Sequence, residues 1–378
     1  MQSIIELEEE VNKLPPKEKR RFKAIFDVST SEGKLKIPDS FRQKVLQYFG
    51  KKNENEQIIE AEKQVLKRLC TQKIVRTFNR RTREGALFNG LRATRPGMRG
   101  QDIAIEKGFV YKHIKEALKN CDLCEPEKLT SEDTFGRVLG KHCTTGANIA
   151  KYDAAHGMLI FNRHNPLEFS REELSDYIEV GFKWFEKARK ANKEFEYPFF
   201  MWNCLGKAGA SQVHGHAHLL VGKGMHYAKV EVLREAIQEY KQKEGGNYFD
   251  DLFGAHESVE LALAPKNSNV RILVYVTPTK EKETVIISPK PVAESDDAKK
   301  AIFKTLRCFI DNLGVTCFNL TVSMPALRAS KSHPHVVRVV DRGSMLKATS
   351  DVAGMELYAS NVIASDPCRV IEALKECF

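Results

Sequence analysis

The chain has 378 residues, of which 42% are hydrophobic and 29% are charged, and its formal net charge is +10. This composition predicts a globular protein of about two or three domains, and no uninterrupted apolar run is long enough to cross a bilayer. The charged N-terminus does not resemble a signal peptide, and nine mostly scattered cysteines favour a reducing compartment, so we expect a cytoplasmic protein. The positive charge favours polyanionic partners such as nucleotides and sugar phosphates.

The first 72 residues predict a helical extension. Apolar side chains recur there at loosely helical intervals, and Pro15 and Pro16 interrupt the pattern. Nothing in this segment indicates chemistry. An oligomer or partner surface is the alternative interpretation.

An arginine-rich stretch follows over residues 76–99. Guanidinium groups match phosphate oxygens bidentately, so these arginines are candidate phosphate contacts. The candidates are Arg80, Arg81, Arg83, Arg92, Arg95 and Arg99. A run of charge is more often a solvated face. Nucleic acid is disfavoured as a partner because the stretch offers only Phe78 and Phe88 for base stacking.

Cys121 and Cys124 form a C-x-x-C pair. Two thiolates at this spacing suit tetrahedral zinc, which needs two further ligands. From spacing alone the nearest candidates are His142 and Cys143. A pair of ordinary buried or redox-active thiols is the alternative.

Residues 156–203 predict a strand, a helix and a second strand. Ser170 and Glu173 fit the S-x-x-E capping box that opens a helix, and the apolar residues after them lie on one stripe. Gly181 in that stripe predicts a close contact with a neighbouring strand. The second strand leads into a polar, glycine-rich loop.

The most informative stretch covers residues 203–222, N-C-L-G-K-A-G-A-S-Q-V-H-G-H-A-H-L-L-V-G. Side chains alternate along a strand, so His214, His216 and His218 share one face. Gly215 and Ala217 occupy the other face, which indicates that another element packs closely against it.

The loop before this strand is suited to phosphate. Gly209 lets the backbone approach a ligand, and Asn203, Ser211 and Gln212 offer uncharged hydrogen bonds. A phosphate beside a histidine row favours a histidine nucleophile acting at phosphorus. A metal cluster and a surface run of histidines are the alternatives.

The second half of the chain repeats the order of the first. Strands are expected at 272–276, 284–288, 318–324 and 335–340, with a helix over 296–312. The last strand begins H-P-H-V-V, a reduced copy of the histidine strand with Val337 in the third position. We therefore predict an α+β protein of two tandem modules, each an antiparallel sheet with packed helices, at 73–225 and 226–378.

These motifs resemble a known superfamily. H-G-H-A-H-L-L fits the histidine-triad (HIT) pattern, and N-x-x-G-x-x-G-A-S-Q-x-H-x-H resembles the active-site segment of its galactose-1-phosphate uridylyltransferase branch. That branch also contains diadenosine tetraphosphate phosphorylases, and tandem HIT-like modules are its architecture. The resemblance covers roughly residues 75–378, and L-R-A-T-R-P resembles the branch's R-A-x-R-P element.

The resemblance implies binding residues. A structural zinc ion would be held by Cys121, Cys124, His164 and His214. Arg92 and Arg95 become the phosphate contacts, and Asn148 becomes a nucleoside contact. The phosphate loop would contribute Asn203, Gly209, Ser211 and Gln212. Relatives are commonly dimers, so a homodimer is implied as well.

The resemblance also implies a mechanism. His216 would attack the α-phosphorus of a nucleotide or nucleotide sugar and form a covalent nucleotidyl-histidine, which a sugar phosphate or phosphate then accepts. His218 departs from the pattern, because the transferases and phosphorylases carry Gln there and triad hydrolases carry His. A histidine can titrate. The alternative function is therefore a hydrolase of dinucleoside polyphosphates or nucleotidyl conjugates.

Some relatives bind a second metal with an H-x-H pair. His333 and His335 form such a pair here, and Glu231 is a candidate carboxylate, but a further histidine ligand is not evident. We interpret the pair as a structural copy without a metal.

Overall fold

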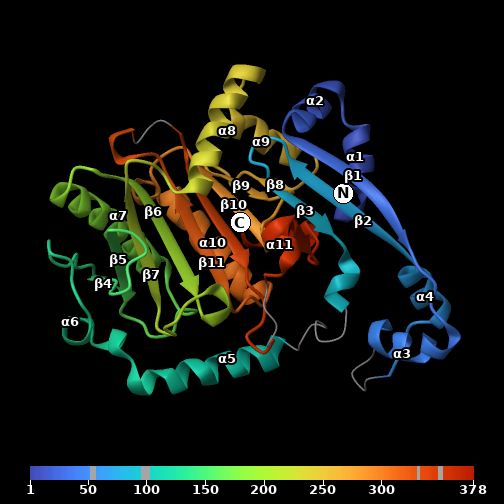
Figure 1. Cartoon of the computed structure of the whole chain (residues 1–378), viewed down its shortest axis with the longest axis horizontal. Helices are drawn as coiled ribbons and strands as arrows, with labels where there is room; N and C mark the ends of the chain where they lie inside the picture. Colours follow the sequence, from blue (N-terminus) through green and yellow to red (C-terminus); the bar gives the residue numbers. More distant parts are fainter. Residues whose placement is uncertain (52–56, 95–102, 330–332, 348–351) are drawn as a thin grey trace.

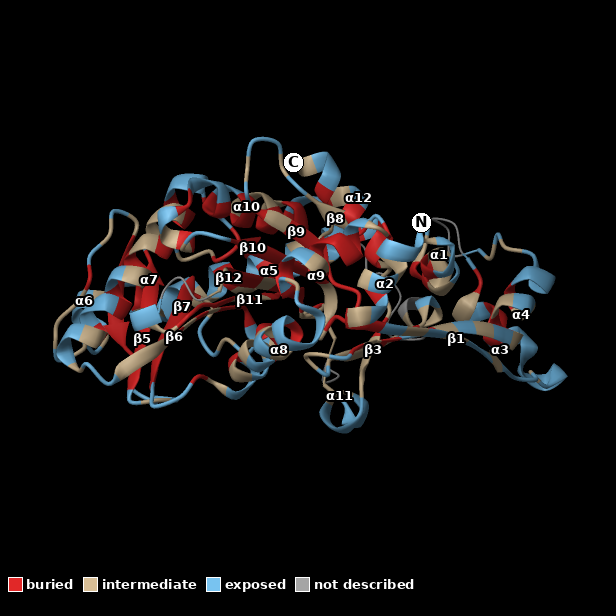
Figure 2. Ribbon diagram, turned by 90° about the horizontal axis from the view of Figure 1, so that it is seen from above, coloured by how far each residue is buried: buried red, intermediate tan, exposed pale blue. Residues whose placement is uncertain are grey.

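The computed structural model describes residues 1–51, 57–94, 103–329, 333–347 and 352–378. Within these residues the strands form a nine-stranded sheet and a separate four-stranded sheet (Figure 1). Two long helices, α7 and α10, lie side by side against the large sheet, and their buried sides face it (Figure 2). None of the described helices is long and apolar enough to cross a membrane.

The first half of the large sheet holds the histidine strand. Its strands are β4 (Cys143–Ala147), β5 (Ala155–Phe161), β6 (Phe195–Cys204) and β7 (His216–Lys223), and its helix is α7 (Arg171–Ala191). The spatial order is β4-β5-β7-β6, with every neighbouring pair antiparallel. The predicted capping box of α7 is present, with Ser170 Oγ accepting from the Glu173 amide at 3.2 Å.

The second half has the same plan. Its elements are β8 (Ala262–Leu263), β9 (Arg271–Val274), β10 (Glu281–Ser288), α10 (Asp296–Arg307), β11 (Phe318–Ser323) and β12 (His335–Asp341). The order β9-β10-β12-β11 matches that of the first half, and β8 lies at the outer edge. The halves join where β11 pairs antiparallel with β6. The predicted tandem α+β architecture is confirmed, and β12 is the counterpart of β7.

The close packing that the sequence predicted on the glycine and alanine side of the histidine strand is present. Gly215, Ala217 and Leu219 alternate on the side of β7 that faces α7, where a Cβ at Gly215 would come within 2.6 Å of the Phe161 ring. Gly181 of α7 meets Leu219 of this face, two positions beyond Ala217. The histidines therefore occupy the opposite face.

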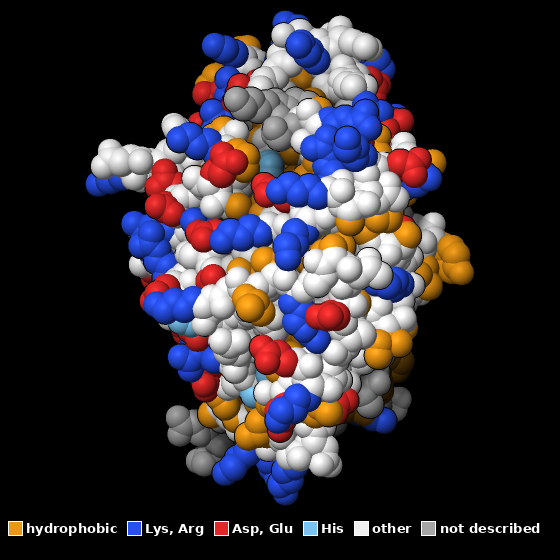
Figure 3. Space-filling view, turned by 90° about the vertical axis from the view of Figure 1, so that its left-hand side faces the viewer, with side chains coloured by type: hydrophobic (Ala, Val, Ile, Leu, Met, Phe, Trp, Pro, Cys, Tyr) orange, Lys and Arg blue, Asp and Glu red, His pale blue; other side chains and the backbone are white. Residues whose placement is uncertain are grey.

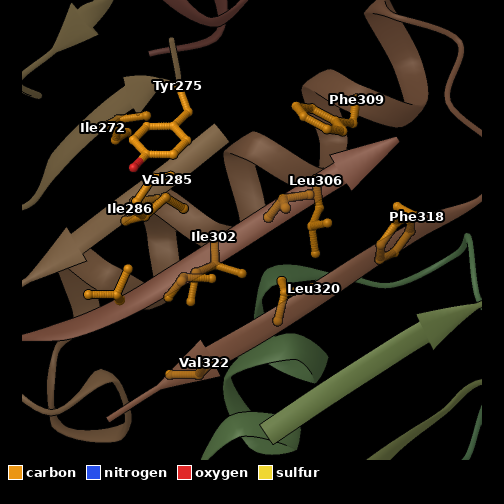
Figure 4. Close-up of a cluster of buried hydrophobic side chains, with 14 of the residues drawn as sticks. Ile272, Tyr275, Val285, Ile286, Ile302, Leu306, Phe309, Phe318, Leu320 and Val322 are labelled. Carbon is orange, nitrogen blue, oxygen red and sulfur yellow. The ribbon is translucent and has the colours of Figure 1, made fainter. Parts of the chain in front are cut away.

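The core of the second half lies between α10 and the strands (Figure 4). Ile302 and Leu306 of α10 and Phe309 just after it are fully buried together with Phe318 and Leu320 of β11. Burying each such side chain contributes about 1.5–3 kcal/mol. This packing fixes β11, and through the β11–β6 pairing it also fixes the strand that leads to the phosphate loop.

The four-stranded sheet carries the N-terminal extension. It has the order β1-β2-β3-β13, formed by β1 (Phe26–Lys34), β2 (Thr71–Asn79), β3 (Gly85–Phe88) and β13 (Asn361–Ile363). The expected helices are present as α1 (Leu7–Lys13), α2 (Pro16–Ile25), α3 (Asp39–Phe49) and α4 (Glu62–Cys70). Strand β1 was not predicted, since it is mostly polar. Nine consecutive pairs with β2 hold it.

Further helices complete the chain. They are α5 (Ile103–Ala117), α6 (Pro126–Leu129), α8 (Ala228–Glu244), α9 (Tyr248–Glu257), α11 (Gly354–Tyr358) and α12 (Pro367–Cys377). Helix α5 crosses one end of the large sheet (Figure 1). Its first turn contacts the segment just before β11, where Thr316 Oγ1 donates to Glu106 at 2.7 Å. Its last turn contacts His164 through the backbone oxygen of Ile114.

Gly157 of β5 is expected to tolerate no side chain. A Cβ there would lie 2.6 Å from two atoms of the Trp184 ring, so Gly157→Ala should lower the free energy of unfolding by about 1–3 kcal/mol, the usual cost of overpacking. Gly108 of α5 is the matched control, since a Cβ there meets nothing within 4 Å. Gly108→Ala should stabilise by up to about 1 kcal/mol. Denaturant unfolding of both variants tests the packing of α7 on β5.

Candidate active site and metal cluster

Two cysteines and two histidines converge beside the start of β7. The ligand atoms of Cys121, Cys124, His164 and His214 all lie within 4.8 Å of one another. The Nδ1 atoms of His164 and His214 are 3.2 Å apart. The Cys121 Sγ lies 3.4 Å from the His214 Nδ1, and the Cys124 Sγ lies 3.4 Å from the His164 Nδ1.

These separations fit a tetrahedral metal ion. Zinc–ligand bonds of about 2.0 Å to nitrogen and 2.3 Å to sulfur place tetrahedral ligands about 3.3–3.8 Å apart. The outer nitrogens are fixed by backbone carbonyls, because the His164 Nε2 donates to the Ile114 oxygen at 3.0 Å and the His214 Nε2 to the Phe161 oxygen at 2.7 Å. Each ring therefore directs an unprotonated Nδ1 into the cluster, which is the support that metal-ligating histidines require.

His142 and Cys143, the zinc ligands that spacing alone suggested, lie outside the cluster. Cys143 is buried against Asp176, at 3.6 Å from its Oδ2, and burial raises the pKa of its thiol. His142 lies 3.7 Å from a Glu172 carboxylate oxygen. The fold thus brings together the set that the family resemblance implied.

His216 is held in one tautomer. Its Nδ1 lies 2.7 Å from the backbone oxygen of His214, to which it donates, so its Nε2 carries the lone pair. Only 4% of the residue is exposed, and burial lowers its pKa. A neutral imidazole with one nitrogen fixed is a competent nucleophile.

His218 contacts a histidine that sequence reasoning missed. The His156 Nε2, from the adjacent strand β5, lies 3.0 Å from the His218 Nδ1. His156 is fully buried, and burial lowers its pKa to about 4 and that of His218 to about 3. His156 sits 58 positions earlier than His214 in the chain, and its one signal was a lone histidine at the head of an apolar strand.

The predicted phosphate loop lies between β6 and β7. Gly209 has a φ of +93°, a left-handed conformation that glycine adopts without strain, and Leu205 has a φ of +67° while fully buried. Asn203 at the end of β6 is buried, and its Oδ1 accepts from Asn319 at 2.7 Å. Ser211 and Gln212 are exposed. The loop therefore offers polar groups to solvent next to buried histidines.

The arginine candidates divide into two groups. Arg80 donates from Nε to Asp27 at 2.8 Å, and Arg81 bonds the Ala24 oxygen and Glu244, so these two hold the extension in place. Arg92 is partly exposed in a short turn after β3, and no hydrogen bond in the described residues joins it to the histidines. Arg95 and Arg99 lie outside the described residues.

Asn148 lies within the site. It lies directly after β4, and its amide Nδ2 atom is 3.3 Å from the His156 Nε2. The side chain thus contacts His156, and its role as a nucleoside contact stays a prediction.

His333 and His335, the H-x-H pair of the second half, lie in different environments. His335 begins β12 and is buried against Phe182, with its Nδ1 accepting from the Val292 amide at 3.4 Å. His333 instead lines a cavity of about 410 Å³ together with His226 and Glu231. Within the described residues, the cysteine–histidine cluster is the group of three or more side chains whose ligand atoms converge for a metal.

Lys and Arg side chains do not form a continuous stripe on the face that carries α7. Acidic side chains are interspersed with them (Figure 3). This face therefore lacks the basic track typical of nucleic-acid binding.

Solved structures share this architecture. An ADP-glucose phosphorylase from Arabidopsis thaliana with bound ADP-glucose superposes with a TM-score of 0.57 at 14% identity, over 78% of this chain and 96% of that one. A GalT-like protein from Arabidopsis thaliana gives 0.56 at 15% identity, over 68% and 92%. A uridylyltransferase gives 0.53 at 14% identity, over 63% and 85%. No family model and no curated protein sequence matches the chain.

The fold is thus that of a tandem α+β protein with two modules of the same strand order. More narrowly, it is the fold of the galactose-1-phosphate uridylyltransferase-like proteins.

Proposed function

We propose that the protein is a nucleotidylyltransferase of the galactose-1-phosphate uridylyltransferase-like class. The observation that carries the proposal is the fixed tautomer of His216, whose Nδ1 donates to the His214 carbonyl at 2.7 Å. That bond leaves the Nε2 lone pair free for attack on phosphorus beside a polar, glycine-rich loop.

The first step forms the covalent intermediate. The His216 Nε2 attacks the α-phosphorus, a P–N bond forms, and the P–O bond to the leaving phosphate breaks, with the electron pair departing on that oxygen. The imidazole becomes cationic, and its Nδ1–H stays bonded to the His214 carbonyl, which stabilises the developing charge. In this proposal Ser211 and Gln212 bind the phosphate oxygens.

The second step returns the enzyme to its starting state. An oxygen of phosphate or of a sugar phosphate attacks the same phosphorus, and the P–N bond breaks to restore the neutral imidazole. A phosphate oxygen brings its own negative charge, so this step needs no base. Nucleotide sugars are the proposed donors. ADP-glucose is a candidate, because the first of the similar structures holds it.

We assign zinc to the cysteine–histidine cluster as a structural ion. Two thiolates and two imidazoles would hold the ion with no ligand position left for substrate, so it would supply stability rather than reactivity. Its effect on chemistry is positional, because His214 contributes both a ligand and the carbonyl that holds His216. The nine unpaired cysteines are consistent with a cytoplasmic location.

The second candidate is a hydrolase of dinucleoside polyphosphates or nucleotidyl conjugates. The observation that favours it is His218, which is buried beside His216 at a ring-centroid distance of 5.3 Å. Water must lose a proton when it attacks phosphorus, so this function requires a nearby group that accepts one.

Intact-protein mass spectrometry tests the proposal. The zinc-loaded protein is mixed with UDP-glucose, ADP-glucose, GTP or diadenosine tetraphosphate, without an acceptor. We expect one nucleoside monophosphate per chain from at least one donor, with the added mass naming the base, and discharge of the adduct on addition of phosphate or a sugar phosphate. Rapid release of free monophosphate without an adduct would support the hydrolase instead.

A further inference from the structure

Asn319 of β11 extends from the second half of the sheet to the phosphate loop of the first half. Strand β11 pairs with β6 so that Asn319 lies directly opposite Asn203. Met201 of β6 pairs with His218, and Asn203 lies two positions beyond Met201, so both asparagines share the face of the histidines. The second half of the chain therefore contributes a polar side chain to the histidine face.

Two neighbours fix the orientation of the Asn319 amide. An arginine side chain only donates, and the Arg342 guanidinium bonds the Asn319 Oδ1, so this atom is the amide oxygen. A peptide carbonyl only accepts, and the Ala208 oxygen lies 2.8 Å from the Asn319 Nδ2, so this atom is the nitrogen. Arg342 is itself anchored directly after β12, because its backbone N–H donates to the Cys317 oxygen at 2.9 Å.

The orientation of Asn319 determines that of Asn203. The Asn319 Nδ2 carries a second proton, which it donates to the Asn203 Oδ1 at 2.7 Å. Asn203 must therefore turn its oxygen to Asn319 and keep its own Nδ2 for another partner. In the described part of the chain no hydrogen bond engages that Nδ2. Asn203 is only 9% exposed, and an unpaired donor there is costly, which indicates a ligand oxygen as its partner.

The same side chain also holds the phosphate loop. The loop makes a short turn over Gly206–Ala208, between Leu205 with a φ of +67° and Gly209 with a φ of +93°. The Ala208 N–H donates to the Leu205 oxygen at 3.0 Å, and the Ala208 carbonyl accepts from Asn319. One residue of β11 thus bonds both Asn203 and the turn that follows it.

We propose that Asn319 is a positioning residue for nucleotidyl transfer, which turns the Asn203 amide so that its Nδ2 donates to an oxygen of the α-phosphate. This inference rests on the proposed function. Negative charge grows on the phosphate oxygens as the new bond forms, so a donor held in place stabilises the transition state. Neither asparagine exchanges a proton. The second module, which lacks the full histidine row, thereby takes part in the reaction.

Replacing Asn319 with aspartate should reverse the Asn203 amide. The introduced carboxylate still accepts from Arg342 but cannot donate, so Asn203 should direct its Nδ2 to that carboxylate and its oxygen to the phosphate. Removing one donor to a developing charge usually costs about 10²–10³ in rate. We expect Asn319→Asp to slow single-turnover transfer by about 100-fold at saturating donor, with a smaller change in KM. Rapid-quench kinetics measure both.

Asn361 provides the matched control. Its Nδ2 donates to the Gly85 oxygen at 3.1 Å in the four-stranded sheet, so Asn361→Asp loses the same kind of bond away from the histidines. This variant should transfer within a few-fold of wild type.

A double-mutant cycle separates the reversal of Asn203 from the added negative charge. In an Asn203→Ala background the amide is absent, so the further Asn319→Asp substitution should slow transfer by only a few-fold. Equal slowing in both backgrounds would overturn the inference, because an effect of charge or of folding does not depend on Asn203. A folded Asn319→Asp protein with normal transfer would overturn it as well.

Neutron diffraction from deuterium-exchanged crystals separates this inference from the proposed function. It should locate the two deuterons of the Asn319 Nδ2 towards the Asn203 Oδ1 and the Ala208 oxygen. An Asn203 that instead donates to Asn319 contradicts the inference whether or not any nucleotide reacts. If the amides lie as expected but no donor gives an adduct on the wild-type protein, the proposed function fails and the orientation of the asparagine pair stands.

Discussion

Replacing His216 with alanine is expected to abolish the nucleotidyl adduct and to lower the transfer rate by at least about 10⁴-fold, a loss typical of removing a covalent nucleophile. The reason is that His216 is the member of the histidine row whose Nε2 is free and whose Nδ1 is fixed by a carbonyl. Pre-steady-state mass spectrometry on the variant measures both the adduct and the rate.

His335 provides a matched control within the same chain. It begins β12, the counterpart of β7, and is 5% exposed against 4% for His216. Its Nδ1 accepts from the Val292 amide, so its role is packing. His335→Ala should therefore retain the adduct and most of the rate. A His216→Ala protein that still forms an adduct at the normal rate would show that another group is the nucleophile.

Replacing Cys124 with serine is expected to remove the metal and to destabilise the fold. The substitution deletes a thiolate that lies 3.4–3.5 Å from both ligand nitrogens of the cluster. We expect zinc content to fall from one equivalent per chain towards zero. The free energy of unfolding should fall by more than about 4 kcal/mol, a range reached when a structural metal is lost. Elemental analysis and denaturant unfolding measure the two effects.

Cys143→Ser is the control for this change. Cys143 is a buried thiol that contacts Asp176 and is not part of the cysteine–histidine cluster, so its variant should keep one zinc per chain. The Cys124 variant should also lose transfer, because His214 both binds the ion and holds His216 through its carbonyl. A fully zinc-loaded Cys124→Ser protein would contradict the assigned ligand set.

The histidine row was predictable because its information is local. The period of two places His214, His216 and His218 on one face. Glycine and alanine on the reverse face indicate tight packing, which Phe161 provides at Gly215. The metal ligands were harder to predict from the sequence. Spacing pointed to His142 and Cys143, and only the family resemblance pointed to His164 and His214, which the fold brings together.

The missed features depend on contacts between distant segments. His156 contacts His218, 62 positions further along the chain, only because β5 pairs with β7. A lone histidine in an apolar strand gives no indication of its partner. Strand β1 was missed for a similar reason. Its polar residues carry little strand propensity, and pairing with β2 decides its conformation.

The most direct test of the central claim is the fate of the nucleotidyl group in a single turnover. The zinc-loaded enzyme is mixed with a donor that gives the adduct, with and without phosphate or a sugar phosphate, and the labelled products are followed. The account predicts that the group stays on the protein without an acceptor and passes almost entirely to the phosphate-bearing acceptor when one is present. Free nucleoside monophosphate formed at the same rate under both conditions would contradict it and identify a hydrolase.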